Sequence, residues 1–107
     1  MAPTIWLDKT AFYLAWFDTL KDEKTKSRIR NRLERIEEDG NFGDCAKVGE
    51  GVLELRFHFG PGWRIYLFQA KPGLYWVLCG GTKDTQQEDV KLAKSMKEQL
   101  ERDHARN

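Results

Sequence analysis

Residues 51–68 read GVLELRFHFGPGWRIYLF, and this stretch decides the fold. Within residues 53–59 an apolar side chain recurs at every second position, which is the pattern of a half-buried strand. Gly60-Pro61-Gly62 is a turn signal, and residues 63–67 repeat the alternation after it. The stretch therefore predicts a β-hairpin with a three-residue loop.

The apolar and polar faces of the two arms match in one favoured register. A three-residue loop pairs Phe59 with Trp63 and sets apolar residues against each other, whereas a one-residue slip opposes apolar and polar side chains on both faces. The polar pairs in this register are His58 with Arg64 and Arg56 with Tyr66. This second face is either an ordinary solvated surface or an anion site, and the spacing alone leaves both interpretations open.

Length and composition indicate one domain, residues 1–107, with a single modest core. No apolar run approaches the roughly 18 residues of a membrane span, and the N-terminus lacks a signal peptide, so no membrane partner is expected. Cys45 and Cys79 are too few for a disulfide framework and fit a reducing compartment. They also lack partners at metal spacing, so we expect no metal and no cofactor. The net charge of +1 leaves nucleic-acid binding to be judged from local charge.

Before the hairpin, the sequence predicts a short strand and two helices. Residues 5–7 form the strand, and residues 12–20 carry an apolar helical face. Asp22 is expected to cap a second helix over residues 23–39, which Gly40 ends. The two helices should form an α-hairpin that packs on a sheet.

The second helix is rich in lysine and arginine, and Arg28 and Arg32 are candidates for RNA or phosphate contacts. Two interpretations remain open for this helix. It is either a solvated face with i,i+4 pairs such as Arg30 with Glu34, or an electrostatic surface for RNA phosphates or an acidic partner.

A glycine-rich loop is predicted for residues 41–51, and it delivers Lys47 to the start of the hairpin. The loop lacks the residue order of a phosphate-binding P-loop. After the hairpin, residues 74–79 are nearly all apolar, which predicts a central strand covered on both faces. Gly80-Gly81 is expected to end that strand.

Lys83 follows in the exit loop, where it can lie near the polar face of the hairpin. A capping box at residues 85–88 begins the last helix, and residues 102–107 are expected to fray. The predicted order is β-α-α-β-β-β-α. It indicates an α+β domain with an antiparallel sheet of three strands, a fourth strand from the N-terminus, the α-hairpin and a C-terminal helix.

Three blocks of sequence carry a family resemblance: Gly49–Arg56 (GEGVLELR), Gly60–Tyr66 (GPGWRIY) and Leu78–Gln86 (LCGGTKDTQ). Together they resemble the RelE/ParE toxin superfamily, and within it the HigB-like branch of addiction module killer proteins. The resemblance extends over residues 4–100 and implies a RelE-like fold.

The resemblance also implies a function. Members of this kind are bacterial, cytoplasmic toxins of type II toxin–antitoxin systems, neutralised by a cognate antitoxin that is a helix-turn-helix DNA-binding protein. RelE and HigB members are mRNA interferases that cut messenger RNA, usually on the ribosome, whereas ParE members share the fold and inhibit DNA gyrase. The expected function is therefore a ribosome-dependent endoribonuclease. The alternatives are a gyrase inhibitor or a catalytically inactive module of a repressor complex.

Relatives keep their working residues at positions that match Arg56 and Arg64, with basic residues at positions matching Lys47 and Lys83. Trp63 stands where tyrosine is common, which keeps a stacking surface without the hydroxyl. An arginine fork suits the charge of a phosphorane, because its planar donors match phosphate oxygens. The lysines suit phosphate binding, or proton transfer if burial lowers their pKa values.

Three further side chains of the hairpin have open roles. Tyr66 is expected to hydrogen-bond, to stack on a base or to pack within the hairpin. His58 is a candidate general base because imidazole titrates near neutrality, although it lies outside the family pattern. Glu54 either holds Arg56 or Lys47 in place or serves as the base itself.

Overall fold

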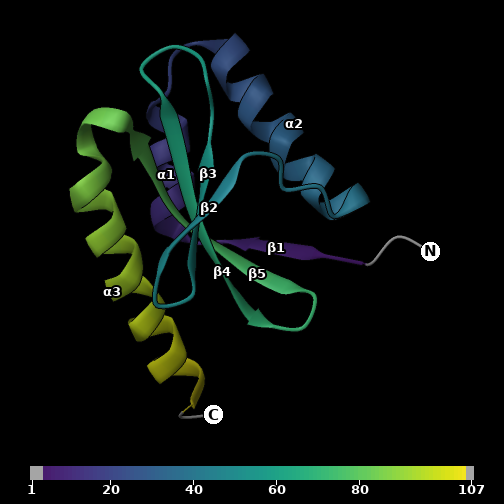
Figure 1. Cartoon of the computed structure of the whole chain (residues 1–107), viewed down its shortest axis with the longest axis vertical. Helices are drawn as coiled ribbons and strands as arrows, with labels where there is room; N and C mark the ends of the chain where they lie inside the picture. The colour runs from purple at the N-terminus through teal and green to yellow at the C-terminus, as the bar shows by residue number, and fades with distance from the viewer. Residues whose placement is uncertain (1–3, 106–107) are drawn as a thin grey trace.

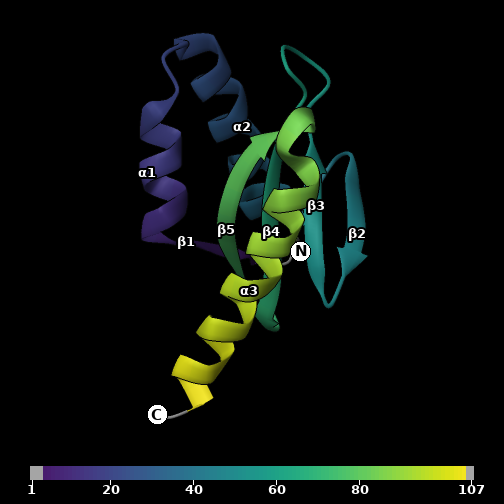
Figure 2. The same ribbon diagram turned by 90° about the vertical axis from the view of Figure 1, so that its left-hand side faces the viewer.

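A five-stranded sheet with helices on both faces forms the molecule (Figure 1, Figure 2). It is described by a computed structural model over residues 4–105. The strand order is β1-β5-β4-β3-β2. The elements are β1 (Trp6–Lys9), α1 (Ala11–Thr19), α2 (Glu23–Asp39), β2 (Cys45–Gly49), β3 (Val52–Arg56), β4 (Trp63–Lys71), β5 (Leu74–Thr82), the 3-10 turn η1 (Lys83–Thr85) and α3 (Gln86–Ala105).

Local chemistry sets the helix ends. Thr10 caps α1, because its hydroxyl accepts a hydrogen bond from the Tyr13 amide at 3.0 Å. Asp22 caps α2 by accepting from the Lys24 amide at 3.2 Å, and Gly40 ends that helix in the left-handed conformation, with φ at 67°. The predicted bounds of this helix, 23–39, are confirmed.

Each face of the sheet packs against its own helices. On one face, α1 and α2 cover a core that includes Leu33, Leu55 and Ile65. On the other, α3 covers a second core that includes Tyr66 and Ala93. The side of the hairpin predicted to be polar is therefore partly buried under α3, which Figure 2 shows crossing the sheet.

The observed sheet differs from the predicted antiparallel sheet in two respects. Residues 45–49, expected as loop, form β2 and pair antiparallel with β3. A bulge between Lys47 and Gly49 obscures the alternation that marks a strand in the sequence. In addition, β1 pairs parallel with β5, so the sheet is mixed.

The hairpin register differs from the prediction by two residues. Arg56 lies opposite Arg64, and Glu54 lies opposite Tyr66. The reason is that β3 ends at Arg56, and residues 57–62 form a wider loop closed by the Phe57 amide donating to the Trp63 carbonyl at 3.0 Å. A two-residue shift preserves the faces, so Arg56, Arg64 and Tyr66 remain on one face, as predicted.

Three predictions for the part of the chain after residue 79 are also wrong. Gly80-Gly81 continues β5 instead of ending it, and an added Cβ on Gly80 would lie 2.5 Å from the Trp16 ring. The capping box joins Thr82 and Thr85 at η1, and α3 runs to Ala105, so residues 102–105 are helical. The remainder of the predicted frayed tail, residues 106–107, lies outside the described residues. Across residues 4–105, none of the helices combines the length and apolar character that a membrane span needs.

Candidate functional site: a paired-arginine face

A buried carboxylate organises the polar groups on the α3 side of the hairpin. Glu54 is 0% exposed. Its Oε1 accepts a hydrogen bond from Arg56 Nε at 2.9 Å, and its Oε2 accepts from the Tyr66 hydroxyl at 2.9 Å and from Gln86 Nε2 at 2.8 Å. Burial alone would raise the pKa of Glu54, but these hydrogen bonds outweigh it and hold the pKa below its ordinary value. The side chain is therefore an ionised anchor with no route to a substrate, which favours the anchoring role over that of a base.

Arg64 is held beside this anchor, and it is only 9% exposed. Its Nε lies 3.9 Å from Glu54 Oε1, and its Nη1 donates to the carbonyls of Gly62 and Trp63 at 3.2 and 3.3 Å. The buried Nε has no hydrogen-bond partner among residues 4–105. Two guanidiniums thus flank one carboxylate, which leaves a local excess of positive charge.

Arg56 and Lys83 complete the cationic group. The Arg56 side chain is 38% exposed, and its hydrogen bond to Glu54 raises its pKa. Lys83 lies in η1, directly after β5, and is exposed. A Cβ placed on Gly62 would lie 3.2 Å from Lys83 Cβ and 3.6 Å from Arg64 Nη1, so both side chains border the same glycine. The structure therefore brings together three of the predicted catalytic residues.

Two aromatic candidates are used in packing. Tyr66 is 0% exposed, and burial and the bond to Glu54 raise its pKa, so it cannot stack on a base in this conformation. Trp63 is half-buried and packs edge-on against Trp16, with ring centroids 6.0 Å apart. Of the interpretations open for Tyr66, hydrogen bonding combined with packing fits the structure.

Lys47 does not join the cationic group. It pairs with Leu53 across β2 and β3, and paired residues of antiparallel strands project to the same face. Leu53 packs against the core under α1 and α2. Lys47 therefore projects from the face opposite Glu54, because the bulged strand β2 replaces the loop that was expected to turn it toward the hairpin's polar face.

His58 lies beyond the end of β3 and faces Asp44, not Arg64 as the predicted register required. Its Nε2 forms a short hydrogen bond with Asp44 Oδ2, and its side chain is 72% exposed. That hydrogen bond lowers the pKa of Asp44. Sequence reasoning missed Asp44 because it precedes β2, the strand that was expected as loop. It also missed Gln86, which was quoted only as part of a motif.

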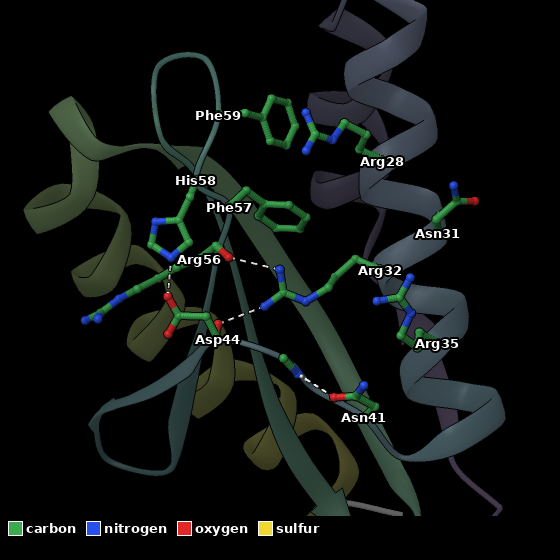
Figure 3. A pocket seen from close by; sticks show the side chains of 11 residues that line it. Arg28, Asn31, Arg32, Arg35, Asn41, Asp44, Arg56, Phe57, His58 and Phe59 are labelled. Atoms are coloured by element: carbon green, nitrogen blue, oxygen red, sulfur yellow. Dashed lines mark hydrogen bonds and ion pairs between the residues drawn. The ribbon is translucent and has the colours of Figure 1, made fainter.

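The two arginines of α2 have different environments (Figure 3). Arg32 donates to the carbonyls of Phe42, Arg56 and Asp44 at 2.8–2.9 Å, and burial lowers its pKa. It therefore ties α2 to the loop and to β3, which is a structural role in place of the predicted surface contact. Arg28 is exposed, and its guanidinium lies over the Phe59 ring, 3.9 Å from the centroid. Within residues 4–105, no group of three or more His, Cys, Asp and Glu side chains is arranged to hold a metal ion.

Sequence comparison matches residues 15–102 to the family described as phage-derived protein Gp49-like (DUF891). The chain belongs to this family. A relative from Haemophilus influenzae, an uncharacterized protein, is 39% identical over 97 residues, covering 91% of this chain and 97% of the relative.

Solved structures show the same fold at low sequence identity. The intact E. coli RelBE toxin–antitoxin complex contains a chain that matches with a TM-score of 0.60 at 12% identity, covering 74% of the Gp49-like chain and 96% of that chain. A mutant of the E. coli toxin RelE in the free state matches with a TM-score of 0.60 at 16% identity, covering 85% and 97%. The RelE-like fold expected from the sequence motifs is thus confirmed.

Proposed function

We propose that this Gp49-like protein is the toxin of a type II toxin–antitoxin system and that it cleaves translated mRNA. The RelE fold supports the toxin role. The observation that carries the ribonuclease activity is the cationic face, where Arg56 lies opposite Arg64 around the buried Glu54 and Lys83 borders them. A purely structural ion pair needs one arginine for one carboxylate, whereas this face has a surplus of guanidinium donors that suits a phosphate.

The proposed reaction is attack of a ribose 2′-oxygen on the adjacent 3′-phosphorus. The bond from phosphorus to the 5′-oxygen breaks, which gives a 2′,3′-cyclic phosphate and a free 5′-hydroxyl. Arg64 and Arg56 stabilise the charge on the phosphorane oxygens, because their donors are already held in place by Glu54 and by backbone carbonyls. The two arginines and the proton-transfer groups together fill every role in the reaction, so the proposal needs no metal ion.

Proton transfer falls to His58 and Lys83. One group must take the proton of the 2′-hydroxyl, and another must protonate the departing 5′-oxygen. His58 is exposed, and its bond to Asp44 orients the ring and leaves the second ring nitrogen for substrate. Lys83 is exposed beside Gly62 and can bind the phosphate or supply the second proton.

An antitoxin is the expected partner. The RelE chain of similar fold was solved in a complex with its antitoxin, and we propose a comparable complex here, with a helix-turn-helix DNA-binding antitoxin. In the same proposal the free toxin acts in the bacterial cytoplasm on ribosomes that are translating mRNA.

Mapping of RNA 5′ ends tests the function. Purified protein is added to translating ribosomes with a defined mRNA, beside an Arg64→Ala control. Cuts within codons that vanish in the control support the proposal. Intact RNA contradicts it, and a gyrase supercoiling assay then tests the ParE-like alternative.

A further inference from the structure

A cationic cavity lies between α2 and the hairpin loop, on the other side of β3 from the paired arginines (Figure 3). Its volume is about 490 Å³, which is within the range of small-molecule sites. Three arginines of α2 and the backbone side of Arg56 line it, and Asp44 is the only carboxylate among its lining residues, already bonded to His58. The cavity therefore favours an anionic ligand.

The α2 wall of this cavity is one face of the helix. Arg28, Arg32 and Arg35 occur at i, i+4 and i+7, with Asn31 between them, so they project together while Ile29 and Leu33 face the core. Figure 3 shows Arg28 and Arg32 extending from α2 toward the hairpin, with Arg35 close to the helix below them. The apolar side of the helix fixes its orientation, and that orientation aims the arginines into the cavity.

The three arginines of α2 differ in the contacts that their guanidinium groups already make. Arg32 is occupied by three carbonyls, and the Arg28 guanidinium lies over the Phe59 ring. For the side chain of Arg35, no hydrogen bond or ion pair occurs within residues 4–105, and it is exposed. The cavity thus combines three parts. Arg32 is held in place by hydrogen bonds, Arg28 over the Phe59 ring forms what we call the Arg28–Phe59 platform, and Arg35 is an exposed cation.

We propose that this cavity binds one nucleotide of single-stranded RNA, with its base on the Arg28–Phe59 platform and its phosphate at Arg35. Nucleic-acid bases stack on aromatic rings and on guanidinium planes. An acidic peptide would use the arginines but not the platform, so the combination favours a nucleotide. This inference rests on the proposed ribonuclease function, since it extends the binding surface for the same substrate.

The position of Arg56 connects the two surfaces. Its carbonyl accepts from Arg32 on the cavity side, while its guanidinium points away from α2 and binds Glu54 (Figure 3). The cavity and the paired-arginine face are therefore the two sides of the end of β3. An RNA chain that passes the exposed His58 can contact both sides, with one nucleotide in the cavity and a neighbouring phosphate at Arg64.

Fluorescence anisotropy with a short labelled 2′-O-methyl oligoribonucleotide tests the proposal. This probe cannot undergo 2′-oxygen attack, so binding is measured whether or not the protein is a nuclease. We expect Arg35→Ala and Phe59→Leu each to weaken binding on the order of tenfold. Only Arg35→Ala should reduce the slope of log affinity against log salt, by roughly one, because it alone removes a phosphate contact.

Arg30→Ala is the matched control. Arg30 lies on α2 but lines a separate groove beside α1, so its removal deletes the same charge from the same helix outside the cavity. Its affinity should stay within about twofold of the wild type. Equal losses for Arg30→Ala and Arg35→Ala, unchanged binding by Phe59→Leu with a native circular dichroism spectrum, or no binding by the wild type would each overturn the proposal. If the cavity variants lose binding but unmodified RNA stays intact, the cavity stands and the proposed nuclease function fails.

Discussion

Arg56 and Arg64 lie directly opposite each other across β3 and β4, with the buried carboxylate of Glu54 against both guanidiniums. Like charges opposite each other in a sheet are destabilising, so the pair depends on that carboxylate. The arrangement concentrates positive charge at one point at the expense of local stability. Functional sites often give up local stability in this way. We therefore expect replacement of Arg64 to affect activity and replacement of Glu54 to affect stability.

Replacing Arg64 should remove activity without unfolding the protein. We expect Arg64→Ala to lower the cleavage rate by about 10²–10³, because one preorganised donor to the phosphorane is lost. Arg64→Lys keeps the charge but not the planar fork, so most of the loss should persist. Single-turnover cleavage of a defined mRNA on ribosomes measures both rates. A rate for Arg64→Lys equal to that of the wild type would show that charge alone is needed.

Replacing Glu54 should instead cost stability. We expect Glu54→Gln to lower the free energy of unfolding by about 1–3 kcal/mol, since the two arginines then face each other without a buried countercharge. Urea denaturation followed by circular dichroism measures the change. An unchanged midpoint would mean that the guanidiniums do not depend on the carboxylate.

The same carboxylate should leave a signature in the pH dependence of stability. Its folded pKa lies below the ordinary value of 4.5, so its contribution is complete above that pH and is lost as the pH falls through the folded pKa. The free energy of unfolding of the wild type should therefore fall more steeply below pH 4.5 than that of Glu54→Gln. The pKa values of Asp22 and Asp44 are also lowered. Both proteins retain these two residues, so their contributions to the pH dependence of stability cancel in the comparison.

His58 and Asp44 should act as a unit if His58 transfers a proton. We expect His58→Gln to reduce cleavage by about 10²–10⁴, because a proton-transfer group is lost. Asp44→Asn should reduce the rate less, because the imidazole itself remains. Single-turnover cleavage of a defined mRNA measures both rates. Unchanged cleavage by His58→Gln would exclude His58 from the mechanism.

Gly80 should tolerate no larger residue while Trp16 stays in place. A methyl group at Gly80 would lie 2.5 Å from the Trp16 ring, so we expect Gly80→Ala to destabilise the fold by about 1–3 kcal/mol. The double variant Gly80→Ala with Trp16→Leu should cost less than the two single changes summed. Thermal denaturation of the four proteins gives the coupling, and strictly additive shifts would show that the two sites do not touch.

The sequence predicted the elements whose signals are local. Alternation in residues 53–59 identified β3, and Asp22 and Gly40 marked both ends of α2. The sequence prediction failed where contacts between residues far apart in the chain determine the structure. Nothing near Gly80 reveals that Trp16 requires a glycine there, and the bulge after Lys47 hides the alternation of β2.

The candidate site, like the fold, was predictable where local sequence signals determine it. The alternation of the two arms placed Arg56 and Arg64 on one face, and a register error of two residues left both arginines there. The error did misplace His58, because its partner depends on where β3 stops. Asp44 and Gln86 reach the site from segments outside the hairpin, so no spacing within residues 51–68 could reveal them.

The parallel pairing of β1 with β5 joins two segments that lie far apart in the sequence. The Thr10 hydroxyl donates to the Leu78 carbonyl at 2.7 Å across 68 positions of sequence, and Gln86 reaches Glu54 later still. Non-local pairing of this kind forms late, and a hairpin of two strands is barely stable alone. Until β5 pairs with β4, the hairpin that carries Arg56 and Arg64 therefore lacks the strand that supports it. The finished site, with Gln86 bound to Glu54, therefore assembles only after β5 and the start of α3 are in place.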